Sequence, residues 1–144
     1  DNENIYMPKI YEGDVIEKLK GLDDKSVDIF ITSPPYWGQR DYDNDDQWGN
    51  EETIDEYLNR MIEWSDECKR VLIDEGTLFL NIGDKYGKKS LNMIPERLCI
   101  KMIENGWVLR NKIILAAYSA QTILYYRNPQ SQHLPETVYP DAQL

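Results

Sequence analysis

The chain has 144 residues, 41% of them hydrophobic and 29% charged, with 16 lysines and arginines against 26 aspartates and glutamates. These proportions exclude a wholly disordered chain, and the length suits one domain with a hydrophobic core. No apolar run approaches the roughly 18 to 20 residues of a membrane-spanning helix, and the N-terminus does not resemble a signal peptide. We therefore expect a cytoplasmic protein without a membrane partner. Two cysteines and one histidine do not provide the ligands of a structural zinc site, and we predict no metal site.

The formal charge of −10 is concentrated in one segment. Residues 41–56 contain eight acids and no base, and the rest of the chain carries a charge of only −2. Four of these acids have the spacing of a calcium-binding loop: Asp41, Asp43, Asp45 and Glu52. Asp46, however, stands where such a loop needs glycine. A solvated acidic loop therefore explains the segment better than calcium binding does.

The predicted elements alternate between strand and helix. Apolar spacing, caps and glycines define, in chain order, a strand at 9–11, a helix at 14–20, a strand at 27–32, a helix at 53–76, a strand at 77–82, a helix at 95–106 and a strand at 107–115. The run Val27–Thr32 is almost entirely apolar, which is typical of strands buried on both faces of a parallel sheet. Thr53 and Glu56 have the spacing of a capping box, and Gly76 is expected to end the long helix. Its apolar residues recur at a spacing of four, three, four and three, which predicts one stripe facing the sheet: Tyr57, Met61, Trp64, Cys68 and Val71.

This alternation predicts an α/β fold with a doubly wound, mostly parallel sheet. We assign residues 1–115 to this domain and treat residues 116–144 as an atypical tail that packs on the same domain or extends it. The composition changes near this point, because residues 113–144 contain only three charged side chains. The tail could complete the sheet edge or form a dimer contact, so a homo-oligomer is one possibility.

The segment after the strand at 27–32 has a coherent chemical use. Ligands of open parallel sheets bind beyond the carboxyl ends of the strands. There Pro34 and Pro35 stiffen the backbone and leave carbonyls without local donors, Ser33 supplies a hydroxyl, and Tyr36 and Trp37 supply flat faces. Together they can hold an amine on a planar base that is stacked on an aromatic ring. A proline-rich turn with core aromatics is the alternative interpretation.

The motif Ser33-Pro34-Pro35-Tyr36 after an apolar strand resembles the catalytic motif of the DNA amino-methyltransferases, which methylate N4 of cytosine or N6 of adenine. Three longer segments are similar to that family in order and spacing: KIYEGDVIEKLKGLDDKSVDIFITSPPYWGQRDY, DEYLNRMIEWSDECKRVLIDEGTLFLNIGDKY and IPERLCIKMIENGWVLRNKII. The match covers residues 9–114. It implies a Rossmann-like methyltransferase fold and a place in restriction–modification.

The resemblance also implies a mechanism. The family transfers a methyl group directly from S-adenosylmethionine to the amine of a base flipped out of DNA. Ser33 and the Pro34 carbonyl would accept hydrogen bonds from the amine, and Tyr36 would stack on the base. Serine rather than aspartate at position 33 favours cytosine N4 over adenine N6.

Further ligand contacts are suggested outside the catalytic motif. Asp14 falls where this fold places an acid near the cofactor's adenosine, although it could equally cap the following helix. Arg40 would reach a DNA phosphate or pair with the acids that follow it, and Trp37 would contact DNA. Cys68 and Cys99 are expected to pack in the core, so no cysteine nucleophile is predicted.

One part of the family pattern is missing. Its glycine-rich cofactor turn, Phe-x-Gly-x-Gly, is absent, because no two of the eight glycines are separated by a single residue. After residue 114 the chain also departs from the family's usual continuation. We therefore expect a truncated member with an unrelated or frame-shifted tail, which alone binds DNA weakly or not at all at physiological salt. A catalytically inactive remnant serving as an interaction or structural module is the alternative function.

Overall fold

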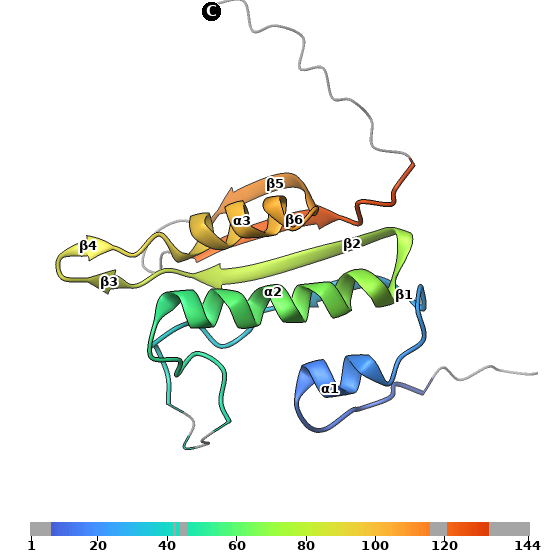
Figure 1. Cartoon of the computed structure of the whole chain (residues 1–144), viewed down its shortest axis with the longest axis horizontal. Helices are drawn as coiled ribbons and strands as arrows, with labels where there is room; N and C mark the ends of the chain where they lie inside the picture. The colour runs from blue at the N-terminus through green and yellow to red at the C-terminus, as the bar shows by residue number, and fades with distance from the viewer. Residues whose placement is uncertain (1–6, 42, 44–45, 116–120, 133–144) are drawn as a thin grey trace, which may run out of the picture.

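The computed structural model describes residues 7–41, 43, 46–115 and 121–132 (Figure 1). Its helices and strands follow in the order α1 (Val15–Lys20), β1 (Val27–Thr32), α2 (Ile54–Val71), β2 (Leu72–Gly83), β3 (Tyr86–Gly87), β4 (Ser90–Leu91), α3 (Ile94–Glu104), β5 (Val108–Ile114) and β6 (Gln121–Arg127). Within the described residues, no helix combines the length and the apolar character that a membrane crossing requires.

Four strands form the main sheet in the order β1-β2-β6-β5, and β3 and β4 form a separate hairpin (Figure 1). β1 pairs with β2 in parallel, whereas β6 runs antiparallel to both of its neighbours, β2 and β5. β1, β2 and β5 therefore share one direction, and β6 is reversed between two of them. The carboxyl ends of β1 and β2 lie at one edge, where ligands bind in open α/β sheets.

One face of the sheet is covered by α2 and α3, which pack against each other and share one core with the strands (Figure 1). Alternate side chains of β2 and β6 point into this core, including Leu78, Leu80 and Tyr126. The predicted apolar stripe of α2 is fully confirmed, and its buried members are Tyr57, Met61, Trp64, Cys68 and Val71. The capping box is also confirmed, with reciprocal hydrogen bonds of 3.2 and 3.1 Å between Thr53 and Glu56.

The other face of the sheet is less covered. Ile31 in β1 exposes 76% of its surface, and Ile29 is also exposed. The expectation that Val27–Thr32 is buried on both faces is therefore wrong: β1 lies at the edge of the sheet, and only one of its faces packs on the core. Phe79 and Tyr125 stack on the less covered face, with their ring centroids 4.6 Å apart.

Two further predictions differ from the structure: one predicted strand does not form, and the long helix ends earlier than expected. Residues 9–11 form no strand, because no described strand lies alongside them, and Ile10 is 92% exposed. The long helix ends at Val71 instead of Gly76, and β2 begins at the next residue. Gly76 lies within β2 where its pairing with β1 shifts register, and a Cβ there would lie 2.7 Å from Cδ2 of Leu72. The glycine permits an irregularity in the strand and does not end the helix.

β6 comes from the tail, whose placement the sequence left open. It pairs with β2 on one side and with β5 on the other, so it is an internal strand and not an extension of the sheet edge. Its alternate residues Thr122, Leu124 and Tyr126 are buried against the helical layer. The division of the chain at residues 115 and 116 stays a prediction, and residues 133–144 lie outside the described part.

Candidate active site

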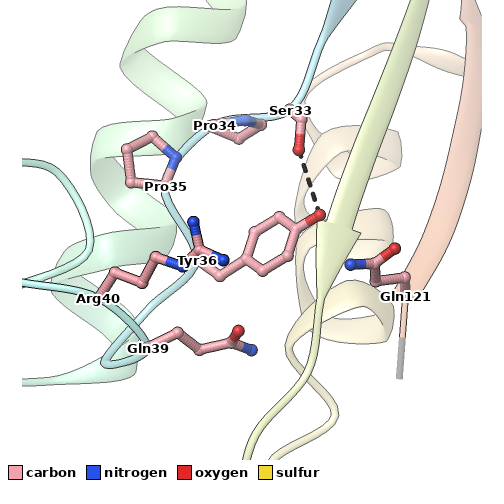
Figure 2. Close-up of a pocket in the computed structure, with 7 residues that line it drawn as sticks. All are labelled: Ser33, Pro34, Pro35, Tyr36, Gln39, Arg40 and Gln121. Atoms are coloured by element: carbon pink, nitrogen blue, oxygen red, sulfur yellow. Dashed lines mark hydrogen bonds between the residues drawn. The ribbon is translucent and has the colours of Figure 1, made fainter. Parts of the chain in front are cut away.

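The motif Ser33–Tyr36 follows β1 directly, at the carboxyl edge of the sheet. Figure 2 shows it beside the end of β2, with Gln121 on the far side of that strand. Gln121 reaches this position because β6 pairs it with Gly83, the last residue of β2. A cavity of about 310 Å³, here called the motif cavity, is lined by Ser33, Pro34, Pro35, Tyr36, Gln39, Arg40 and Gln121.

Tyr36 lays its ring across the end of β2 (Figure 2). Its hydroxyl lies 3.1 Å from Ser33 Oγ, and either oxygen can donate the hydrogen. Gly83 allows the ring to lie there, since a Cβ at that position would be 2.7 Å from Cδ2 of Tyr36. The ring is therefore supported by glycine backbone on one side and oriented by Ser33 at its hydroxyl.

The backbone of the motif is held by other segments of the chain. The Tyr57 hydroxyl, on α2, donates to Pro35 O at 3.0 Å. Burial raises the pKa of Tyr57, so this hydroxyl remains a protonated donor. Two further bonds hold the residues after the motif: Gly38 N to Gly49 O at 2.7 Å, and Gln39 Nε2 to Asp84 O at 2.9 Å. Within the described part of the chain, no donor reaches the Pro34 carbonyl, which is therefore available to a ligand.

The motif cavity thus combines two hydrogen-bond acceptors with an aromatic face. Ser33 Oγ keeps acceptor capacity while it is bonded to Tyr36, because a hydroxyl oxygen has two lone pairs. The Pro34 carbonyl is the second acceptor. A planar ring carrying an amine would donate to both oxygens while its face lies against Tyr36.

A second cavity, of about 680 Å³, adjoins the first and is here called the flanking cavity. The two cavities share Ser33, Pro34 and Pro35. The rest of the flanking cavity is lined by Gly13, Asp14, Val15, Thr32, Asp46, Gln47, Trp48 and Trp64. Its volume is typical of sites for small ligands and cofactors. Two ligands, one in each cavity, would meet at the shared residues.

Asp14 caps α1 and lines the flanking cavity. One carboxylate oxygen accepts hydrogen bonds from Ile16 N and Glu17 N at 3.0 and 3.2 Å, and the other accepts one from Trp48 Nε1 at 3.3 Å. Burial raises the pKa of this carboxyl, but the three hydrogen bonds and nearby Arg60 outweigh burial, so the pKa lies below its ordinary value. The predicted capping role is confirmed, and the cofactor role stays a prediction.

Trp37 and Arg40, the two residues predicted to contact DNA, lie in different surroundings. Arg40 borders the motif cavity, and its guanidinium forms no ion pair with any acid that the structure describes. Trp37 lines neither cavity; its indole N–H donates to Glu51 O at 2.9 Å, and Lys85 Nζ lies 5.6 Å from its ring centroid. Trp37 therefore helps to fix the loop after the motif. DNA contacts for both residues stay predictions.

Sequence reasoning missed four residues that shape the site. Tyr57 was assigned only to an apolar stripe, although a buried tyrosine hydroxyl needs a partner, and this requirement signals a second role. Gly83 ends a strand, a position where glycine marks close approach of another group. Gln39 and Gln121 carry no comparable signal, and Gln121 belongs to a tail whose placement could not be derived.

The structure also bears on the nucleophile and metal predictions. Cys68 and Cys99 are both buried, and burial raises the pKa of each thiol, which confirms that they pack in the core. Among the described residues, no group of three or more histidine, cysteine or acidic side chains is arranged to hold a metal ion. The calcium spacing includes Asp45, which lies outside the described residues.

The arrangement of helices and strands resembles that of solved DNA methyltransferases. The PvuII DNA methyltransferase, which is cytosine-N4-specific, gives a TM-score of 0.68 at 21% identity over 84% of this chain and 49% of that chain. TTHA0409 of Thermus thermophilus, solved in complex with S-adenosyl-L-methionine, gives a TM-score of 0.63 at 22% identity over 81% of this chain and 51% of that chain. These likenesses define the fold, a Rossmann-like α/β methyltransferase fold.

The sequence comparison defines the family. The model of the N6/N4 DNA methylases matches residues 27–139, and the chain belongs to this DNA methylase family. The Type II methyltransferase M.MwoI of Methanothermobacter wolfeii is 48% identical over 110 residues, which cover 74% of this chain and 16% of that relative. The chain thus spans a minor part of M.MwoI and about half of each solved protein.

The family match corrects one expectation about the tail. It continues through residue 139, so the likeness to the family does not stop at residue 114, and the prediction of an unrelated or frame-shifted tail is wrong. The low charge of this region agrees with the position of β6 inside the sheet, where its alternate side chains are buried.

Proposed function

We propose that this chain supplies the catalytic part of a DNA methyltransferase that transfers a methyl group from S-adenosylmethionine to an exocyclic amine, with N4 of cytosine as the favoured target. The observation that carries the proposal is that two adjoining cavities share Ser33, Pro34 and Pro35. A flipped base in the motif cavity and a methyl donor in the flanking cavity would meet at these residues.

The flanking cavity has features that suit this cofactor. The pKa of Asp14 lies below its ordinary value, so its carboxylate is ionised at neutral pH and can accept hydrogen bonds from hydroxyl or ammonium groups. Val15, Trp48 and Trp64 add apolar lining. The sequence contains no Gly-x-Gly turn, so we propose that a segment outside this chain provides the remaining cofactor contacts.

The residues of the motif cavity would activate the amine. Its lone pair is delocalised into the base, so it is a poor nucleophile. Ser33 Oγ and Pro34 O would accept its two hydrogens and draw the nitrogen toward a tetrahedral shape, which returns the lone pair to the nitrogen. The same oxygens would stabilise the positive charge that develops on nitrogen as the new bond forms. S-adenosylmethionine, when bound, supplies a methyl group attached to a positively charged sulfur.

Tyr36 would fix the plane of the base. Its ring lies against Gly83 and its hydroxyl is bonded to Ser33, so the stacking face is oriented before a base arrives. Serine in place of aspartate at position 33 favours cytosine over adenine. The cytosine-N4 specificity of the structurally similar PvuII enzyme supports this preference.

A catalytically inactive remnant that acts as an interaction or structural module is the second candidate. The absence of a Gly-x-Gly turn from the sequence favours it. A homo-oligomer through the tail is a further prediction, and a strict monomer in sedimentation experiments at high concentration would count against it.

A chimera tests the proposed activity. Residues 7–139, which include every residue that lines the two cavities, would replace the matching segment of M.MwoI, and incorporation of labelled methyl groups into duplex DNA would be measured. We expect the chimera to methylate DNA and Ser33→Ala to lower the rate at least about 100-fold, as the loss of a transition-state hydrogen bond does. Ser26→Ala, in the turn before β1, is the matched control and should leave the rate within about twofold. A folded chimera that binds S-adenosylmethionine without transferring methyl groups would favour the remnant.

A further inference from the structure

The hairpin formed by β3 and β4 projects from the end of β2, away from both large helices (Figure 1). Tyr86 pairs with Leu91 and Gly87 with Ser90, so Lys88 and Lys89 alone form its loop. Its base is closed by the hydrogen bond from Asn92 N to Lys85 O, at 3.0 Å. We call residues 85–92 the lysine hairpin.

The tip of the lysine hairpin has an unfavourable backbone for its residues. Lys88 and Lys89 have φ values of 48° and 74°, as a two-residue type I′ turn requires. Asn-Gly is the preferred pair in such a turn, because side chains other than those of glycine, asparagine and aspartate fit the left-handed region poorly. Residues held in such conformations cluster at functional sites. The two lysines are therefore poor choices for the turn itself, which points to a use for their charge.

The charge of this region opposes that of the whole chain. Residues 85–95 contain three lysines and no acid, although the chain carries −10. Lys85 is held in place, since its ammonium donates to Gly38 O and lies over the Trp37 ring. Lys88 and Lys89 are exposed and form no ion pair with a described residue. Tyr86, with 69% of its surface exposed, adds an aromatic ring beside them.

The lysine hairpin lies near the motif cavity. It begins two residues after Gly83, the glycine against which the Tyr36 ring rests. The contact between Lys85 and Gly38 joins the base of the hairpin to the loop that follows Tyr36. A duplex that presents a flipped base to the motif cavity would therefore bring its sugar–phosphate backbone to this end of the sheet.

We propose that the lysine hairpin is a DNA-docking element in which Lys88 and Lys89 contact phosphates beside the flipped base. The inference rests on the proposed function, because it takes duplex DNA as the polyanion. Lysine ammonium groups release condensed counterions when they bind phosphates, so the contact adds affinity without selecting a sequence.

The double substitution Lys88→Asn with Lys89→Gly separates charge from structure. It removes both ammonium groups while installing the residue pair that the turn prefers. Affinity for a labelled duplex would be measured by fluorescence anisotropy on the full chain, at low salt and over a salt series. We expect the affinity at low salt to fall at least about tenfold, and the slope of log affinity against log salt to decrease by about 2. The thermal unfolding midpoint should not fall.

A matched control removes the same charge elsewhere. Lys9→Gln with Lys18→Gln alters exposed lysines on the segment before α1 and on α1, and neither lysine lines the motif cavity or the flanking cavity. This variant should change the affinity less than about twofold. Equal losses in the two variants would show a general electrostatic attraction and overturn the proposal, as would undiminished binding of the hairpin variant or no binding by the unmodified chain at low salt.

The outcome can be separated from that of the proposed methyl transfer. Ser33→Ala should keep the salt slope of the unmodified chain, because the hydroxyl contacts no phosphate in this scheme. If the chain binds DNA through the hairpin but the chimera does not methylate DNA, the docking proposal stands and the proposed catalysis fails. If the chimera methylates DNA but the hairpin variant binds DNA undiminished, the docking proposal fails and the proposed role of the motif cavity stands.

Discussion

Two loops of opposite charge lie at the same end of the sheet (Figure 1), which is also the end where Ser33–Tyr36 line the motif cavity. The acidic loop, residues 41–53, is the second part of the connection between β1 and α2, and the lysine hairpin follows β2. The acidic loop is tied to α2 by Arg60, which lies 3.3 Å from Glu51 and stacks over Trp48 at 4.6 Å from its centroid. The tip of the hairpin has no such tie to the described part of the chain.

The difference shows why the total charge of this chain does not by itself exclude a polyanionic partner. Glu51 of the acidic loop is engaged internally: it pairs with Arg60 and accepts a hydrogen bond from Gly49 N at 2.8 Å. Lys88 and Lys89 instead project from the surface. The approach of a polyanion is governed by the local field at the surface it meets, so a chain at −10 can still carry a site for phosphates. Weak DNA binding by the isolated chain at physiological salt stays a prediction.

The largest expected effect is on stability beneath the acidic loop. Trp48 exposes 9% of its surface, belongs to the core and bonds to Asp14. Trp48→Ala should lower the free energy of unfolding by about 3 kcal/mol, because it opens a cavity and removes the stacking partner of Arg60. Tyr86→Ala on the hairpin should change it by less than about 0.5 kcal/mol. Urea unfolding of both variants measures the two free-energy changes. Equal losses would contradict the conclusion that Trp48 anchors the acidic loop in the core while the hairpin contributes little to stability.

Gly83→Ala tests the point where the two regions meet. The new Cβ would lie 2.7 Å from the Tyr36 ring, so the ring must shift, and this shift disturbs the bond between its hydroxyl and Ser33. We expect a loss of about 2 kcal/mol in the free energy of unfolding and a changed NMR environment for Tyr36. Gly21→Ala is the matched control, since its Cβ would meet only Lys18 O, at 3.4 Å, and its loss should stay below about 0.5 kcal/mol. An unmoved Tyr36 ring in Gly83→Ala would show that the contact does not position it.

The fold was predictable where a signal is local. The capping box at Thr53 and Glu56 and the stripe along α2 depend on residues within a few turns, and both were predicted correctly. The burial of β1 was not, because it depends on how many strands flank it. β6 also carried no usable period, since its position between β2 and β5 is set by pairing with distant residues.

In the candidate site, too, the residues with a local sequence signal were predictable, and those placed by distant strand pairing were not. Ser33–Tyr36 could be identified because four adjacent residues carry the pattern. Gln121 could not, because it reaches the cavity through the pairing of β6 with Gly83. The lysine hairpin was missed because three lysines in a short segment are invisible in a net charge. Its proposed role also rests on the positive φ values at Lys88 and Lys89, which only the structure shows.

Arg60→Met tests whether Arg60 holds the acidic loop against α2. The substitution keeps much of the apolar stem but removes the charge that pairs with Glu51 and stacks on Trp48. We expect a loss of about 1 kcal/mol in the free energy of unfolding and altered tryptophan fluorescence, because the cation over the Trp48 ring is gone. Lys9→Met, at an exposed position without a described ion pair, is the control and should leave both unchanged. No change in Arg60→Met would mean that Arg60 does not hold the loop.

Asp14→Asn gives the smallest expected effect and tests the charge beneath the acidic loop. The pKa of Asp14 in the folded chain lies below its ordinary value of 3.8, so ionised Asp14 stabilises the fold above that pH. This stabilisation is lost as the pH falls through the lower, folded pKa. Asparagine still caps α1 but does not titrate. The unmodified chain should therefore be more stable than the variant at neutral pH, and the difference should shrink below pH 3.8. Urea unfolding over a pH series measures this change, and a difference that stays constant with pH would mean that Asp14 acts on stability only as a neutral cap.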